Sequence, residues 1–229
     1  MLGRNLKNLK YSNSLNSQTP YQESDRSLIE RSSGQLMPAS TIQPQMVHLP
    51  SSIPQVNDIL EGGLKWGELS EWGSPWGHGG REVLIHFLSN LNSHDTDHSQ
   101  WCLWIQGREG VNVYPPAWEA KGVDLKYIRF TKSLSPIRDL KPVFLTPFFK
   151  VIVLDCPERL SLEDCQFLGR QARRHGQAII LIRNFFLSPK KGNVWAKLRL
   201  NCWHHNISNQ FYIKVIKGLS PRQIAFKLD

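Results

Sequence analysis

The 229-residue chain lacks any run that approaches about 18 consecutive apolar residues, and its mean hydropathy is −0.36. A membrane-spanning helix needs about 20 such residues, so none is expected. The N-terminal residues are partly basic but do not include the apolar segment of a secretory signal. The sequence therefore predicts a cytoplasmic protein without a membrane partner.

Cysteine is scarce, with four residues at positions 102, 156, 165 and 202 and no Cys-x-x-Cys pair. Zinc sites and disulfide frameworks need closely spaced or regularly paired cysteines, so we expect neither, and a reducing compartment fits. His204 and His205 have no Cys or carboxylate at ligand spacing, so we expect no metal site there. No Ser/His/Asp or Cys/His catalytic set is indicated.

Acidic residues are absent from positions 166–228, a stretch that holds twelve Lys and Arg. The whole chain has a net charge of +9, whereas residues 1–165 contain 16 basic and 18 acidic residues. One third of the chain therefore carries the entire positive excess. This asymmetry indicates an anionic partner, most simply nucleic acid. The alternative is a solvated basic face without a specific ligand.

The chain divides by composition at about residue 46. Residues 1–46 contain eight Ser and no sustained apolar periodicity, which predicts a disordered tail or a short docking segment, with a brief helix at 27–31. Residues 47–229 are expected to form one domain.

Strand and helix patterns alternate in that domain. The expected strands are 68–72, 101–105, 127–130, 151–155 and 178–182. The expected helices are 53–60, 83–91, 117–121, 137–149 with interruptions at Pro142 and Pro147, and 161–174. Three further strands, 198–203, 211–216 and 224–228, follow without an intervening helix. This order predicts an α/β fold with a mostly parallel twisted sheet, helices on both faces and a C-terminal antiparallel β-meander.

A glycine-rich turn joins the expected strand 68–72 to the expected helix 83–91, which is the layout of a phosphate-binding loop. Such a loop has the pattern G-x-x-x-x-G-K-[ST], in which Lys reaches the terminal phosphates and the hydroxyl ligates Mg²⁺. The window here, residues 75–82, reads PWGHGGRE. Arg81 replaces the Lys, and Glu82 places a carboxylate where phosphate should lie. A Mg-ATP site and a scaffold without nucleotide both remain open.

Two carboxylates follow predicted strands of this core. Asp155 ends the strand 151–155, where an aspartate typically holds Mg²⁺ or its water beside a phosphate loop. The alternative is an aspartate that caps the turn before Pro157. Glu109 follows the strand 101–105 and is the candidate for orienting an attacking water if the protein is an ATPase.

Aromatic and basic residues are interleaved between the strand 178–182 and the meander, and further lysines follow in the meander. Base stacking combined with phosphate contact is typical of single-stranded nucleic acid binding. The candidate DNA-binding residues are Phe185, Phe186, Lys190, Lys191, Trp195, Lys214 and Lys217. Two alternatives remain: the phenylalanines belong to the core beside a solvated turn, or Trp195 joins Trp118 and Trp203 in a protein interface.

The order of these features is similar to that of the RecA family, from residue 49 to residue 228. The similar stretches are 49–51 (LPS), 59–71 (ILEGGLKWGELSE), 122–128 (GVDLKYI), 151–155 as the Walker B strand, 182–184 (IRN) as a polar sensor before a DNA-binding loop, and 214–221 (KVIKGLSP). Within the family the sequence most resembles the ImuA group, through residues 193–200 (NVWAKLRL).

The resemblance implies a RecA-like P-loop core and an accessory or adaptor role in DNA repair, specifically in SOS-induced, error-prone translesion synthesis. It implies as partners an ImuB-type homologue of Y-family polymerases, an error-prone polymerase, RecA and single-stranded DNA. If ATP and Mg²⁺ bind, the resemblance assigns them to the residues Gly77, Gly79, Gly80, Arg81, Glu82 and Asp155, with Asp155 on the metal. The altered loop favours little or no ATP hydrolysis, and a genuine RecA-superfamily ATPase stimulated by single-stranded DNA is the alternative.

Overall fold

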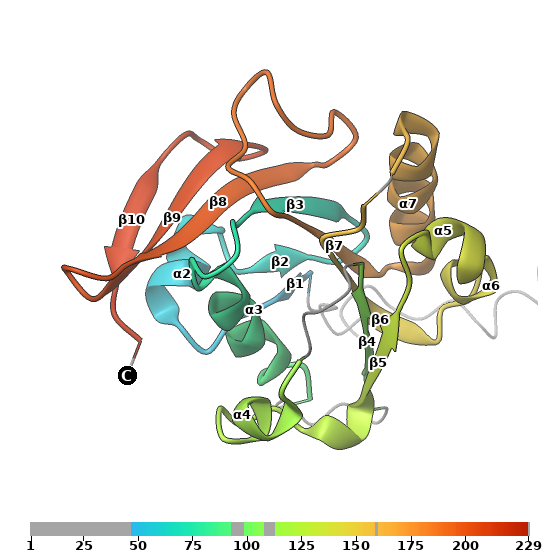
Figure 1. Cartoon of the computed structure of the whole chain (residues 1–229), viewed down its shortest axis with the longest axis horizontal. Helices are drawn as coiled ribbons and strands as arrows, with labels where there is room; N and C mark the ends of the chain where they lie inside the picture. The colour runs from blue at the N-terminus through green and yellow to red at the C-terminus, as the bar shows by residue number, and fades with distance from the viewer. Residues whose placement is uncertain (1–46, 93–98, 108–112, 159, 229) are drawn as a thin grey trace, which may run out of the picture. The chain divides into compact units, whose positions relative to one another are not determined.

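The computed structural model describes residues 47–92, 99–107, 113–158 and 160–228. The main sheet has eight strands in the order β10-β9-β8-β3-β7-β6-β4-β5 (Figure 1). Their bounds are β3 Leu69–Gly73, β4 Trp101–Gln106, β5 Ile128–Lys132, β6 Phe149–Asp155, β7 Ala178–Arg183, β8 Leu198–His205, β9 Gln210–Lys217 and β10 Gln223–Phe226. A separate pair, β1 (His48–Leu49) and β2 (Leu64–Lys65), is antiparallel.

The sheet has a parallel part and an antiparallel part, as expected. The strands from β8 to β5 pair in parallel, and β8, β9 and β10 form an antiparallel meander. The β3 strand lies between β7 and β8. Because β3 and β8 are parallel, the loop that follows β3 lies beside the C-terminal end of β8, the first strand of the meander. This adjacency brings the glycine-rich turn next to residues far along the chain.

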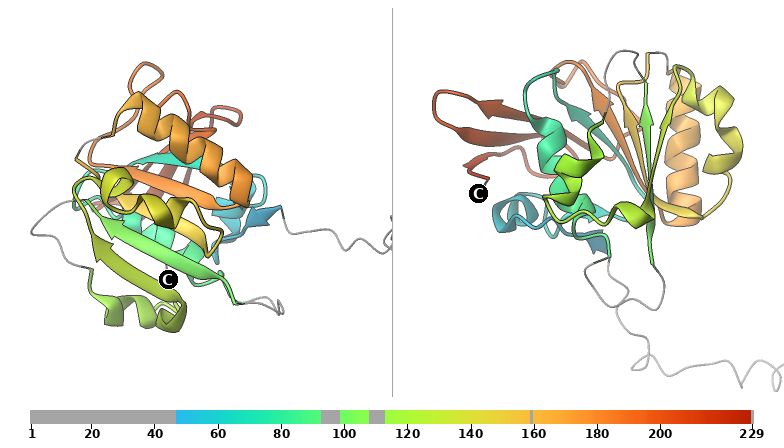
Figure 2. Two further views of the ribbon diagram at one scale, coloured as in Figure 1. Left: turned by 90° about the vertical axis from the view of Figure 1, so that its right-hand side faces the viewer. Right: turned by 60° about the horizontal axis from the view of Figure 1, so that its bottom comes forward.

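Helices cover both faces of the sheet (Figure 2). They are α2 (Pro54–Ile59), α3 (Gly80–Leu88), α4 (Pro115–Glu119), α5 (Pro136–Asp139), α6 (Lys141–Phe144) and α7 (Leu162–His175), with a 3₁₀ helix η2 at Leu125–Tyr127. Two apolar clusters fill the space between helices and sheet, one around Trp72, Phe87 and Trp104 and the other around Leu154, Leu168 and Leu181. The α/β class with helices on both faces is therefore confirmed.

Local sequence explains most helix boundaries. Ser161 caps α7: its hydroxyl accepts from the Asp164 amide at 3.0 Å while the Asp164 carboxylate accepts from the Ser161 amide, the predicted capping box. The expected helical stretch 137–149, which its two prolines interrupt, is confirmed in part. Pro142 has no N–H to donate to the Arg138 carbonyl, and α5 ends at Asp139 before α6 begins at Lys141. The α6 helix ends at Phe144, and Phe149 already belongs to β6.

The expected tail 1–46, with its brief helix at 27–31, lies outside the described residues. None of the helices that the structure describes is both long and apolar enough to cross a membrane. The four cysteines are all buried and unpaired.

Candidate nucleic-acid interface beside the glycine loop

The glycine loop, residues 74–79, connects β3 to α3 as the sequence predicts. Gly79 precedes the helix in the left-handed conformation, with φ +70°, and a Cβ there would lie 2.8 Å from Phe211 Cε1. The His204 amide donates to the His78 carbonyl at 2.7 Å, so the loop is tied to β8. Close packing on the meander therefore accounts for this glycine without a phosphate ligand.

Arg81 occupies the place where the loop lysine would meet phosphate, and its side chain turns onto Asp155. Its Nε lies 2.9 Å from Oδ2 and its Nη2 lies 2.6 Å from Oδ1, so both carboxylate oxygens are engaged. Asp155 is 3% exposed. A face of the guanidinium lies on Trp76, with Cζ 3.6 Å from the ring centroid. Arg81 is thus enclosed between an aromatic ring and a carboxylate.

Several other polar groups around the loop are engaged, whereas Ser74 Oγ and Trp76 Nε1 are buried without a hydrogen-bond partner among the described residues. The Arg81 Nη2 donates to Cys156 Sγ at 3.1 Å, and burial together with the Asp155 carboxylate raises the pKa of this thiol to about 12. Glu82 accepts from Lys121 Nζ at 2.7 Å, away from the loop. The Trp76 amide donates to Asn184 Oδ1 at 2.7 Å, so one amide of the loop is satisfied from the end of β7.

These residues do not fit Mg-ATP. A nucleotide site of this type needs a cation that contacts the terminal phosphates and an aspartate that is open to Mg²⁺ or its water. Here the cation and the aspartate neutralise each other, and a carboxylate replaces the metal-binding hydroxyl. Glu109, the candidate for orienting water, lies outside the described residues.

The linker, residues 184–197, is anchored over the sheet at both ends. At its start, the Asn201 side chain binds the Leu187 backbone, accepting from the amide at 2.7 Å and donating to the carbonyl at 3.0 Å. At its other end, the Asn193 amide donates to Glu71 Oε2. Glu71 is wholly buried and also accepts from Arg183 Nε at 2.7 Å. A buried charge network therefore holds the linker in place.

The middle of the linker is a turn that presents lysines. Ser188 and Lys191 exchange backbone hydrogen bonds of 2.9 and 3.2 Å. Lys190 and Lys191 are exposed, and Lys191 Nζ lies 4.0 Å from the Phe185 ring centroid. The proposed mixture of aromatic and basic side chains therefore exists at this turn.

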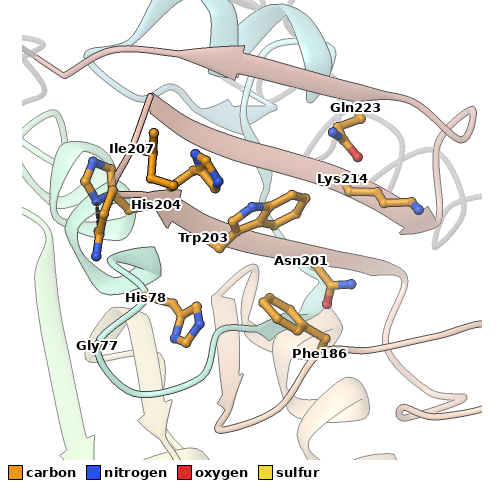
Figure 3. A pocket seen from close by; sticks show the side chains of 11 residues that line it. Gly77, His78, Phe186, Asn201, Trp203, His204, Ile207, Lys214 and Gln223 are labelled. Carbon is orange, nitrogen blue, oxygen red and sulfur yellow. Dashed lines mark hydrogen bonds between the residues drawn. The ribbon is translucent and has the colours of Figure 1, made fainter. Parts of the chain in front are cut away.

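An aromatic pocket of about 750 Å³ lies between the glycine loop and the outer face of the meander (Figure 3). Its walls are His78 from the loop, Phe186 from the linker, and Trp203 from β8. Phe186 meets both of the others edge-on, with ring centroids 5.7 Å from His78 and 5.8 Å from Trp203. Behind Trp203, Tyr212 of β9 is stacked at 5.3 Å, which fixes the indole plane.

The polar residues of the aromatic pocket come from consecutive strands. Asn201, Lys214 and Gln223 form one row across β8, β9 and β10, because each is paired with the next in the sheet register. The described residues that line the aromatic pocket include no Asp or Glu. Aromatic faces, amide groups and one exposed ammonium provide for stacking, base-edge hydrogen bonds and phosphate contact.

The structure separates the seven predicted DNA-binding residues into three places. Phe186 and Lys214 line the aromatic pocket. Phe185, Lys190 and Lys191 belong to the turn of the linker, and Trp195 and Lys217 line a different cleft against α7. The alternative that places Phe186 in the core is wrong, because its side chain is 43% exposed.

Sequence reasoning missed His78, Asn201 and Trp203 as pocket residues. A signal was present in the meander: Asn201, Trp203 and His205 alternate with the buried Leu200 and Cys202. Alternation in a strand places the first three on one face.

No protein-family model matches the chain, and no curated protein sequence matches it significantly.

Proposed function

We propose that the chain is a RecA-type accessory protein that binds single-stranded nucleic acid and does not hydrolyse ATP. The Arg81–Asp155 pair is the observation that carries this proposal. Nucleotide hydrolysis requires a cation for the phosphates and a carboxylate for the metal, and here the two candidate groups bind each other. The strand–glycine loop–helix unit of β3 and α3, followed by parallel strands, supports the RecA-like P-loop ancestry of the core.

The aromatic pocket supports binding of unpaired bases. Phe186 and Trp203 offer ring surfaces, Lys214 offers a cation, and the lysines at the turn of the linker extend the positive surface. Stacking on aromatic side chains with phosphate contact tolerates many sequences. We therefore expect binding to single-stranded DNA with little sequence preference.

The biological setting follows from the resemblance to the ImuA group. In that setting the protein is an adaptor in SOS-induced translesion synthesis, and its partners are an ImuB-type homologue, an error-prone polymerase and RecA. Recovery of tagged protein from DNA-damaged cells should co-purify at least one of these partners, and their consistent absence would contradict this part of the proposal.

The deciding experiment measures two ligands on the full chain. Titration calorimetry with Mg-ATP should give no saturable heat, with or without an oligothymidine of about 20 nucleotides. Fluorescence anisotropy of the labelled oligothymidine should give saturable binding. Saturable ATP binding that is lost in Arg81→Ala would favour the ATPase alternative.

Two substitutions locate the nucleic-acid site. Trp203→Ala and Phe186→Ala should each weaken oligothymidine binding about fivefold or more, since one base–aromatic stack contributes about 1–3 kcal/mol. Tyr114→Ala is the matched control, because Tyr114 is exposed but does not line the aromatic pocket. Equal effects of all three substitutions would argue against the aromatic pocket as the site.

A further inference from the structure

A second cleft, of about 900 Å³, lies between α7 and the end of the linker, and we call it the α7 cleft. It shares no lining residue with the aromatic pocket. Its lining includes Arg170, Arg173, Val194, Trp195, Lys197 and Lys217.

The rim of the α7 cleft presents apolar side chains on a fixed backbone. Val194 is 65% exposed and Trp195 is 45% exposed. Lys217 Nζ donates to the carbonyls of Val194 and Ala196 at 2.7 and 2.9 Å, and the Trp195 amide donates to Asn193 Oδ1 at 2.9 Å. Ordered apolar side chains lose little conformational entropy on binding, which is typical of interface anchors.

The α7 cleft carries an excess of positive charge. Arg170 and Arg173 are exposed one turn apart on α7, and neither forms an ion pair with a described residue. Lys197 and Lys217 also line the α7 cleft, and burial, together with the charges of Arg199 and Lys197, lowers the pKa of Lys217. Glu68 also lines the α7 cleft, but it lies 3.8 Å from Lys65 and is partly neutralised.

We propose that the α7 cleft docks an acidic segment of a partner protein, with an apolar side chain of that segment on Val194 and Trp195. Charge complementarity argues for an acidic occupant. Val194 is more exposed than the neighbouring Trp195, and this argues for a peptide occupant. Nucleic-acid bases stack on aromatic rings, whereas an aliphatic side chain such as valine offers them no stacking surface. The chain's own residues 1–46 contain five basic and three acidic residues, so they carry the wrong net charge. This inference does not depend on the proposed nucleic-acid site.

The test uses the full chain and a labelled synthetic peptide in which Asp and Glu flank a central Leu-Phe pair. Anisotropy should show saturable binding that weakens with salt. Two control peptides, one with Ser in place of Leu-Phe and one with Lys in place of the acidic residues, should bind weakly or not at all.

Matched protein variants assign the contact. Arg173→Glu should weaken peptide binding about fivefold or more, whereas Arg174→Glu, the same change one residue along α7, should leave it within about twofold. Trp195→Ser should weaken it about tenfold or more, with Leu162→Ser as the exposed apolar control on α7. None of the four variants should alter oligothymidine affinity more than about twofold.

Several outcomes would overturn the proposal. The first is that the wild type does not bind the peptide. The second is that the variants and their controls lose peptide affinity equally. The third is that oligothymidine competes with the peptide and that Arg173→Glu also loses affinity for DNA. The last result would assign the α7 cleft to nucleic acid. A change in sedimentation of Trp195→Ser would instead assign it to a second copy of the chain.

Discussion

Glu71 of β3 and Arg183 of β7 form an ion pair with Oε1 and Nε 2.7 Å apart beneath the linker. Arg199 of β8 is the register neighbour of Glu71, and the Asn193 amide also donates to this wholly buried carboxylate. The negative charge of Glu71 compensates the positive charge of Arg183, which has lost most of its contact with water.

Replacing this carboxylate should therefore be costly. Glu71→Gln should lower the free energy of unfolding by about 3 kcal/mol, because it leaves Arg183 without its buried counter-charge. Urea unfolding followed by circular dichroism measures the change. Glu68→Gln, which affects the exposed pair with Lys65, is the control and should cost less than about 1 kcal/mol. Equal losses would show that the buried network does not stabilise the fold.

Arg81 provides a second test of a buried pair. Arg81→Ala should destabilise the protein by about 2–4 kcal/mol, since Asp155 would remain buried without its partner. The double variant Arg81→Ala/Asp155→Ala should be less destabilised than the sum of the single variants. Arg138→Ala removes an exposed partner of Asp139 and should change stability by less than about 0.5 kcal/mol. Additive effects in the double variant would contradict the pairing.

Lys214 should contribute to nucleic-acid binding by contacting phosphate. Lys214→Gln should reduce the slope of log affinity against log salt by about 0.7, the value for one phosphate contact on a single strand. The measurement is oligothymidine anisotropy across a salt series. Lys141→Gln changes an exposed lysine on α6 and should leave the slope unchanged. An unchanged slope in Lys214→Gln would remove this lysine from the interface.

The environment of His86 on α3 predicts that the folded protein becomes less stable in acid. Burial, reinforced by Lys121, lowers the pKa of His86, and its Nδ1 lies 2.7 Å from Ser52 Oγ. The unfolded chain therefore takes up this proton more readily than the folded protein. The stabilising contribution is complete above about pH 6.5 and decreases as the pH falls through that value toward the lower pKa of the folded state. Urea unfolding at high and low pH should show a smaller loss for His86→Gln than for the wild type.

The glycine loop offers a matched pair of substitutions. Gly77 and Gly79 have φ angles of +77° and +70°, but a Cβ at Gly77 meets open space whereas one at Gly79 lies 2.8 Å from Phe211. Gly77→Ala should cost about 1 kcal/mol through backbone conformation alone. Gly79→Ala should cost clearly more, because Phe211 must move. Thermal unfolding of the two variants compares these costs, and equal values would contradict close packing of the loop on the meander.

Most of the fold was predictable because its signals are local. Runs such as 151–154 and 178–182 combine β-branched or apolar residues with strand length, and the capping box at Ser161 fixes the start of α7. The expected helical stretch 137–149, interrupted by its two prolines, was right for α5 and α6 but wrong for Phe149, because a short apolar pattern fits both helix and strand.

The candidate site was only partly predictable because it depends on strand order. The β8 strand lies beside β3, and this neighbour determines which residues of the meander contact the glycine loop. No local sequence pattern specifies that β8 pairs with β3. The partner of Arg81 is 74 positions away, and the buried environment of Glu71 arises from β7, β8 and the linker together. Trp195 lies close to Lys191 in sequence, yet it lines another cleft together with Lys217.

Because the linker is secured at Leu187 and at Asn193, the turn between them can be altered without loosening the sheet. A cysteine introduced in place of Lys190 would be the only exposed thiol among the described residues, since the four native cysteines are buried. That position therefore suits a photocrosslinker or a spin label that reports on whatever approaches this edge of the protein.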